Sequence, residues 1–98
     1  MAFIWDVEDW QDNVGKWAEK TFPQSSQESI IAHLRDEVNN EIGVDCDPDE
    51  LADCVMLLLH LAHKRGIHLD QEMRNKFSKN KERKWGNVNS KGFWEHIE

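Results

Sequence analysis

Cysteine, proline and tyrosine are scarce in this sequence, and long hydrophobic runs are missing. Its 98 residues include two cysteines, two prolines and no tyrosine. Cys46 and Cys54 lack the CxxC spacing of a redox or zinc motif, and two thiols give no sign of a disulfide framework. We therefore expect reduced thiols in a cytoplasmic protein.

Positive charge is also in short supply. Twelve Lys and Arg residues stand against 19 Asp and Glu residues, which gives a formal net charge of −7. A general nucleic-acid binder should be basic, so we expect no nucleic acid polymer as a partner. No apolar run reaches membrane-spanning length and the start lacks a charged-then-apolar signal pattern, so we expect no membrane association either.

The length of the chain bounds its architecture. Ninety-eight residues fit a single domain, 1–98, with a modest core that is too small to enclose a deep cleft alone. An enzyme of this size would complete its site across a subunit interface. The tryptophans near the start and the aromatic residues of the tail exceed what a small monomer buries, which predicts a homodimer or homotetramer.

Hydrophobic periodicity predicts an all-α fold, a bundle of about four helices. The first helix runs from about Val7 to Lys20, with Asp6 as its cap. Its tryptophans are expected to pack, and a wall for a flat heterocycle, made by one of them or by Phe22, is the alternative. The second helix runs to about residue 42 and ends at Gly43. Its candidate caps are Ser25, Ser26 and Ser29, with Ser25 and Glu28 at capping-box spacing.

The second half of the chain continues the helical pattern. A third helix is expected from Asp47, as cap, to about Lys64 or Arg65 before Gly66, antiparallel to the second. A fourth covers about 71–84, and residues 86–98 are expected to form an irregular tail that packs back or contacts a partner.

Two neighbouring helices carry acids where apolar residues are expected. The apolar arc of the second helix comprises Ile30, Ile31, Leu34, Val38 and Ile42. At 100° per residue, Glu41 falls inside this arc and Glu37 lies at its edge. The third helix has one narrow stripe made of Glu50, Asp53, Leu57, His60 and Lys64. A carboxylate on a buried face is costly unless it is paired, so two inward acids on each helix suggest the oxygen ligands of a hard cation.

A structural explanation stands beside this one. Acids at i,i+3 or i,i+4 commonly form a solvated face. Asp47 as cap, Pro48 at the first helical position and Glu50 at the third also explain the acidic run as the start of a helix.

Histidines near these acids have structural interpretations. His33 precedes Glu37 by one turn and is placed to hydrogen-bond to it. His60 and His63 lie one turn apart, but a third zinc ligand at suitable spacing is missing.

The fourth helix is strongly basic inside an acidic protein. Lys76, Asn80 and Arg83 share one helical face, and Trp85 follows directly. Cations opposite an acidic metal site suit a polyphosphate, because metal and side chains neutralise different oxygens. The alternative is a solvated, charge-balanced helix.

Together these motifs resemble the MazG-like all-α nucleoside triphosphate pyrophosphohydrolases, in their short stand-alone or phage-type form. That family uses an ExxE pair and an ExxD pair on consecutive helices to hold magnesium. The second pair matches Glu50 and Asp53 in ELADCVMLLLHLAHKRGI, whereas the first is altered, because Asn40 stands at the second acid and Glu41 follows. The distal family pattern matches Lys76, Asn80, Arg83 and Trp85, and the ending KWG…KGFWEHI is also similar.

The resemblance implies an enzyme that converts an NTP or dNTP to the monophosphate and pyrophosphate with Mg²⁺, or Mn²⁺ as the alternative ion. The metal-site residues would be Glu37, Asn40, Glu41, Glu50 and Asp53. Glu37 or Glu41 would be the catalytic base, and the distal motif would bind the triphosphate. Because Asn40 cannot supply charge, we predict that Glu41 supplies the missing carboxylate through a local widening of the helix. The alternative function is an inactive nucleotide-binding or protein-interaction module of the same fold.

Overall fold

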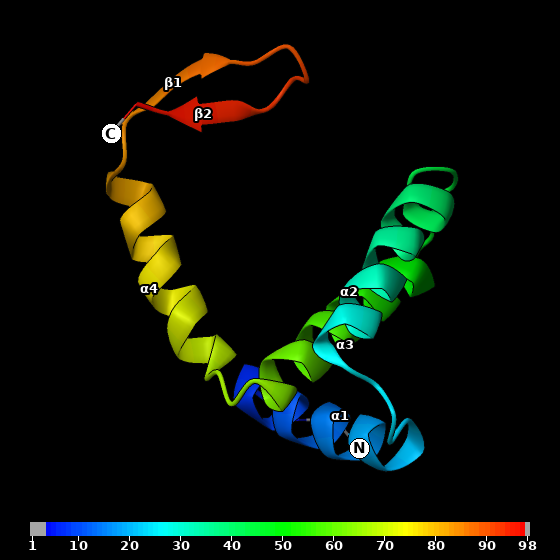
Figure 1. The fold of residues 1–98 in the computed structure, drawn as a ribbon. Coiled ribbons are helices and arrows are strands. Elements are labelled where there is room, and N and C mark those ends of the chain that lie inside the picture. Colours follow the sequence, from blue (N-terminus) through cyan, green and yellow to red (C-terminus); the bar gives the residue numbers. More distant parts are fainter. Residues whose placement is uncertain (1–3, 98) are drawn as a thin grey trace.

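The computed structural model describes residues 4–97, and most of this chain is helical. The elements, in chain order, are α1 (Val7–Thr21), α2 (Gln27–Asp36), the π-helix η1 (Glu37–Ile42), α3 (Pro48–Lys64), α4 (Leu69–Glu82), β1 (Trp85–Val88) and β2 (Trp94–His96). The all-α prediction with four main helices is confirmed. Figure 1 shows α2 and α3 side by side and antiparallel, with α1 across one end of the pair and α4 diverging from it.

Local hydrogen bonds explain where the first two helices begin. The Asp9 backbone N–H donates to Asp6 Oδ1 at 2.8 Å, so Asp6 caps α1 as expected. The capping box of α2 instead joins Ser26 and Ser29, whose backbone N–H donates to Ser26 Oγ at 3.1 Å. The Ser25 and Glu28 pairing is therefore wrong, because the helix starts one residue later and Ser25 lies outside it.

The third helix starts and ends where the sequence predicts. Asp47 is the N-cap, Pro48 takes the first helical position, and the Asp47 N–H points at Glu50 Oε2, 3.4 Å away. Pro48 has no N–H to lose there. Gly66 follows with φ +66°, the left-handed conformation that commonly ends a helix.

Close packing of α1 on α3 forms the centre of the molecule. The buried apolar side chains are small or medium in size: Val14, Ala18, Ile30, Cys54, Leu59 and Ala62. Gly15 lets the two helices approach, because a Cβ at this position would lie 2.1 Å from His63 Cγ. His63 thus has a packing role, and a zinc role is not needed to explain it.

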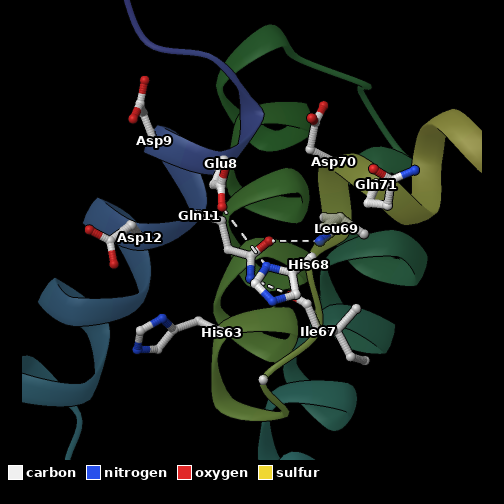
Figure 2. Close-up of a pocket in the computed structure, with 11 residues that line it drawn as sticks. Glu8, Asp9, Gln11, Asp12, His63, Ile67, His68, Leu69, Asp70 and Gln71 are labelled. Atoms are coloured by element: carbon white, nitrogen blue, oxygen red, sulfur yellow. Dashed lines mark hydrogen bonds and ion pairs between the residues drawn. The ribbon is translucent and has the colours of Figure 1, made fainter.

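One glutamine joins α1 to the link between α3 and α4. Gln11 Nε2 donates to the Ile67 carbonyl at 2.6 Å, and the Leu69 N–H donates to Gln11 Oε1 at 3.1 Å. Figure 2 shows this side chain between the two backbone segments. Both polar ends of Gln11 are thereby used, which fixes the start of α4.

The tail is a β-hairpin, which corrects the expectation of an irregular segment. β1 and β2 pair antiparallel, with Trp85 opposite His96 and Val88 opposite Trp94. The Asn89 side chain organises the turn by accepting from the Lys91 N–H at 2.9 Å. The strands are only a few residues long, too short for their alternation to stand out from a tail rich in Gly and Asn.

Candidate active site

The four acids on the second and third helical segments lie on elements that pack together. Glu37 and Glu41 belong to η1, while Glu50 and Asp53 belong to the first turns of α3. We call these residues the acid cluster. The predicted widening of the helix is confirmed, since 37–42 form a π-helix. A π-turn adds a residue to the helical repeat and so changes which side chains face α3.

Electrostatics indicates how close these acids are. The pKa of Glu50 lies above its ordinary value of 4.5, first because of partial burial and next because of a hydrogen bond shared with the Glu41 carboxyl. The pKa of the Cys54 thiol is also raised, mainly by burial and then by the charges of Glu37, Asp53 and Glu50. Glu50 and Glu41 therefore lie within hydrogen-bonding reach of each other, and Glu37, Asp53 and Glu50 all lie near Cys54 on α3.

Asn40 and Glu41 contact different parts of the molecule. The Asn40 amide donates to the Asp36 carboxylate one turn earlier, and both residues are exposed. Glu41 interacts with Glu50 across to α3. The structure therefore ties Asn40 to its own helix and brings Glu41 to the third helix.

Glu37 is held by a histidine, as its spacing suggests. His33 Nε2 lies 3.3 Å from Glu37 Oε1, and the Glu37 side chain is 15% exposed. This contact limits the orientations of the carboxylate at the edge of the acid cluster.

The carboxylates of the acid cluster are suitable ligands for a hard cation, although their side chains do not converge on a single point. Within residues 4–97, no three His, Cys, Asp or Glu side chains converge tightly enough to hold a metal ion as they stand. Carboxylate oxygens are nevertheless the ligands that magnesium, manganese and calcium prefer. Burial and the neighbouring Glu41 raise the pKa of Glu50, and a bound cation would favour the charged carboxylates of both residues.

The distal motif comes together at the end of α4. The Trp85 indole N–H donates to the Asn80 carbonyl at 3.0 Å, and Arg83 Nη1 lies 3.4 Å from Asn80 Oδ1. Lys76 is exposed one turn earlier on the same helix. Figure 1 shows that α4 leads away from α2 and α3, so one chain does not place these cations opposite its own acid cluster.

A cavity of about 420 Å³ opens beside the acid cluster. Its wall includes Glu37 and Asp53, and it extends past Trp17 and Phe22 to the buried His60. Figure 2 shows a larger cavity of about 860 Å³, between α1 and the start of α4, which does not include any residue of the acid cluster.

A sequence model of the dATP/dGTP pyrophosphohydrolases matches residues 10–98. The chain belongs to this family. Its members are hydrolases that act on nucleotide anhydrides, so the expected class of enzyme is confirmed at the level of the family.

Named relatives come from bacteriophages. A dATP/dGTP diphosphohydrolase of Cyanophage S-2L is 30% identical over 93 residues, which cover 93% of this chain and 88% of the relative. One of Salmonella phage PMBT28 is 29% identical over 92 residues, but the chain spans only 31% of that protein's length.

A solved relative supports the fold. The structure of the Cyanophage S-2L MazG-like pyrophosphohydrolase, bound to dGDP and three catalytic Mn²⁺ ions per active site, is similar with a TM-score of 0.82. The match has 30% identity and covers 96% of this chain and 99% of the relative. The predicted MazG-like fold is therefore confirmed.

Some features of the site are not evident from the sequence. His60 shares the predicted stripe with Glu50 and Asp53, but the sequence relates it only to His63, one turn away. The stripe was the available signal, since the same face that carries the acids continues into the cavity. Glu19 has no such signal, because it comes from α1 and reaches His60 and Lys64 only in the folded chain.

Proposed function

We propose that this protein hydrolyses a purine deoxynucleoside triphosphate, releasing the monophosphate and pyrophosphate, at the acid cluster. The observation that carries the proposal is the contact of Glu41 with Glu50 across η1 and α3, with Glu37 and Asp53 beside the same part of α3, in a fold whose relatives carry dATP/dGTP diphosphohydrolase names. Crowded acids raise the energy of the metal-free site, and a cation with a bound polyphosphate relieves it.

Glu37, Glu41, Glu50 and Asp53 would hold Mg²⁺, or Mn²⁺ as bound by the cyanophage relative. A divalent ion supplies charge neutralisation on the phosphates and makes water more acidic. Within the cluster, Glu37 or Glu41 would accept the proton of the attacking water at a carboxylate oxygen. Asn40 would contribute at most a neutral amide oxygen, and its amide group is engaged by Asp36.

The triphosphate site would be completed by a second copy of the chain. Large apolar side chains are exposed on three helices, with Val55 at 54% and Phe77 at 66%. A cavity of about 790 Å³ lies over this surface, lined among others by Trp10, Val55 and Met73. Covering it with a partner would bury apolar area and bring that partner's Lys76, Asn80, Arg83 and Trp85 towards the acid cluster.

The substrate and products can be tested together. Purified protein is incubated with each common NTP and dNTP and either Mg²⁺ or Mn²⁺, and pyrophosphate and orthophosphate are measured separately. We expect dGTP or dATP to give the highest rate and pyrophosphate to be the product. Nucleotide binding without hydrolysis would instead favour the inactive module of the same fold.

Shared sites can be tested by mixing two inactive variants. Asp53→Asn damages the acid cluster and Arg83→Ala damages the distal motif. If one copy completes the site of another, some sites in a reassembled mixture combine an intact acid cluster from one chain with an intact distal motif from the other. Random mixing of the two variants then restores up to about a quarter of the sites. No recovery in mixtures that light scattering finds to be hetero-oligomers would refute the shared site.

None of the helices in the described part of the chain is long and apolar enough to span a membrane. We propose a cytoplasmic location, because Cys46 and Cys54 are both free thiols, and Cys46 is exposed.

A further inference from the structure

Two aromatic side chains line the cavity beside the acid cluster and remain half exposed. Trp17 is 52% exposed and Phe22 is 47% exposed. Their ring centroids lie 5.5 Å apart and their planes meet at 88°, so one ring presents its edge to the other. We call these two residues the aromatic pair. Their open apolar area is available to a ligand in the cavity.

The backbone holds the aromatic pair in place. Trp17 lies in the second half of α1, and Phe22 is the residue that caps the end of this helix. The Phe22 N–H donates to the Ala18 carbonyl at 2.7 Å, and the Ser25 N–H donates to the Phe22 carbonyl at 3.0 Å. The Ala18 side chain is buried in the core, which fixes the same turn. Rings on a fixed backbone lose little conformational freedom when a ligand binds, so the pair is preorganised.

The polar side chains of the wall are directed to other parts of the chain. Three of them contact another residue: Ser29 contacts Ser26, His33 contacts Glu37, and His60 contacts Glu19. His60 Nε2 is buried and faces Glu19 Oε2 at 3.8 Å, so this atom belongs to the packing of α1 on α3. A ligand in the cavity therefore meets mainly apolar and aromatic surface.

The position of the cavity relates it to the phosphates. Glu37 and Asp53 belong both to its wall and to the acid cluster. A nucleotide with its phosphates at the cluster would therefore have its base in the cavity, whose volume of about 420 Å³ is in the range of small-molecule sites. The inference that follows rests on the proposed function.

We infer that the aromatic pair binds the purine by its faces, and that the site accepts purine deoxynucleotides with an altered hydrogen-bonding edge. Adenine carries the N6 amino donor where guanine carries the O6 acceptor, but both present the same bicyclic face. Stacking on aromatic side chains depends on that face and tolerates different edges. The Ser25 hydroxyl, in the same wall, can donate or accept and so suits either purine. The substrates would then include the deoxynucleoside triphosphates of hypoxanthine and 7-deazaguanine.

The first test compares dGTP with dATP, dITP and 7-deaza-dGTP in the wild-type protein. The hypoxanthine of dITP lacks the amino group of guanine, and 7-deazaguanine lacks the N7 acceptor, while both keep the bicyclic face. We expect kcat/KM for all four purines to agree within about threefold, and dCTP and dTTP, with one ring to stack, to be at least about tenfold lower. A loss of more than about tenfold on either altered purine, the effect of one missing hydrogen bond, would overturn the inference.

The second test removes the aromatic faces one at a time, in Trp17→Leu and Phe22→Leu. Leucine keeps apolar packing but cannot stack, so each change should raise the KM for dGTP and dATP alike by about 5- to 100-fold, with kcat within about threefold. Trp17→Phe keeps a ring and should stay within about threefold of the wild type. Trp94→Leu is the control, because Trp94 is 58% exposed on β2 and lies outside this cavity.

Binding of dGDP in Mn²⁺, measured by calorimetry, separates this inference from the proposed function. A wild type that binds dGDP, loses affinity in Trp17→Leu and hydrolyses no triphosphate would refute the function and support the aromatic pair. Hydrolysis of dGTP with an unchanged KM in both folded leucine variants would overturn the inference alone. If circular dichroism finds Trp17→Leu unfolded, Phe22→Leu decides under the same criterion.

A second copy of the chain is the alternative occupant of the cavity. Light scattering of the leucine variants distinguishes it from a base, because loss of a subunit contact lowers the molecular mass. A lower mass in Trp17→Leu, together with an unchanged Kd for dGDP, would overturn the inference and assign the aromatic pair to an interface.

Discussion

Two acidic regions of this molecule differ in what their carboxylates contact. The cavity in Figure 2, which we call the acidic groove, is lined by Glu8, Asp9, Asp12 and Asp70. All four of these acids have ordinary structural partners. Asp9 closes the capping box of α1, Asp12 lies 2.9 Å from Lys16 Nζ, and Asp70 lies 3.1 Å from Arg74 Nε. Glu8 Oε1 lies 3.9 Å from His68 Nδ1.

The acid cluster has fewer opposite charges. Glu50 shares a hydrogen bond with Glu41. The charges of Glu37, Asp53 and Glu50 all contribute to raising the pKa of the Cys54 thiol. Within the acid cluster, only Glu37 forms an ion pair in the part of the chain that the structure describes, and its partner is His33. Glu50 also has the start of α3 beside it, as Asp9 has the start of α1, so the distinguishing feature of the cluster is that Glu50 shares a hydrogen bond with a second acid, which indicates a cation from outside. Cavity size alone would favour the acidic groove instead.

Asp53→Asn and Asp12→Asn give the largest expected contrast between the two regions. Both changes remove one charge at almost constant shape. We expect Asp53→Asn to lower the rate of pyrophosphate release by about 100- to 1000-fold, because a ligand for charge stabilisation is lost. Asp12→Asn, on an exposed ion pair, should change the rate by less than about twofold. Equal rates for the two variants would place the active site outside the acid cluster.

The second contrast lies within η1, between Glu41→Gln and Asn40→Ala. Glu41 faces Glu50, whereas Asn40 is bound to Asp36. We expect about a 100-fold loss of divalent-dependent activity from Glu41→Gln and less than about threefold from Asn40→Ala. The reverse order would mean that Asn40 retains the family's ligand position and that Glu41 is structural.

Local chemistry explains what the sequence could predict. Helix starts at Asp6 and Asp47 and the end at Gly66 depend on neighbouring residues only, and these predictions are confirmed. The π-helix was also foreseeable, because the family motif and the apolar arc disagree by one residue at Asn40 and Glu41.

Long-range arrangement explains what the sequence could not predict. The direction of α4 depends on Gln11, which binds both Ile67 and Leu69 from more than fifty positions away. The hairpin depends on pairing across a turn, and the contact of His60 with Glu19 joins α3 to α1. None of these contacts leaves a periodic signal, and the roles of the individual site residues remain predictions.

A third contrast concerns stability and is smaller. Glu50→Gln removes a charge that is partly buried among other acids, and glutamine still offers an oxygen to the Asp47 N–H. In the presence of a chelator we expect its melting temperature to rise by a few degrees. Asp70→Asn loses the Arg74 pair and a favourable charge in the first turn of α4, so its melting temperature should fall slightly. Thermal unfolding by circular dichroism checks both, and a fall in both variants would mean that Glu50 is a stabilising residue.

The smallest expected effect is a pH dependence of stability. It concerns Glu19, an acid outside both regions that pairs with Lys64. Its pKa is lowered below 4.5, first by the Lys64 hydrogen bond, so its contribution to stability is full above about pH 4.5 and is lost as the pH falls through the lowered value. Glu19→Gln should therefore reduce the free energy of unfolding modestly at pH 7, and the difference from wild type should vanish in acid. Denaturant titrations of both proteins between neutral and acidic pH measure this difference. A difference that stays constant across that range would show that Glu19 acts through packing, and that its ion pair with Lys64 does not stabilise the fold.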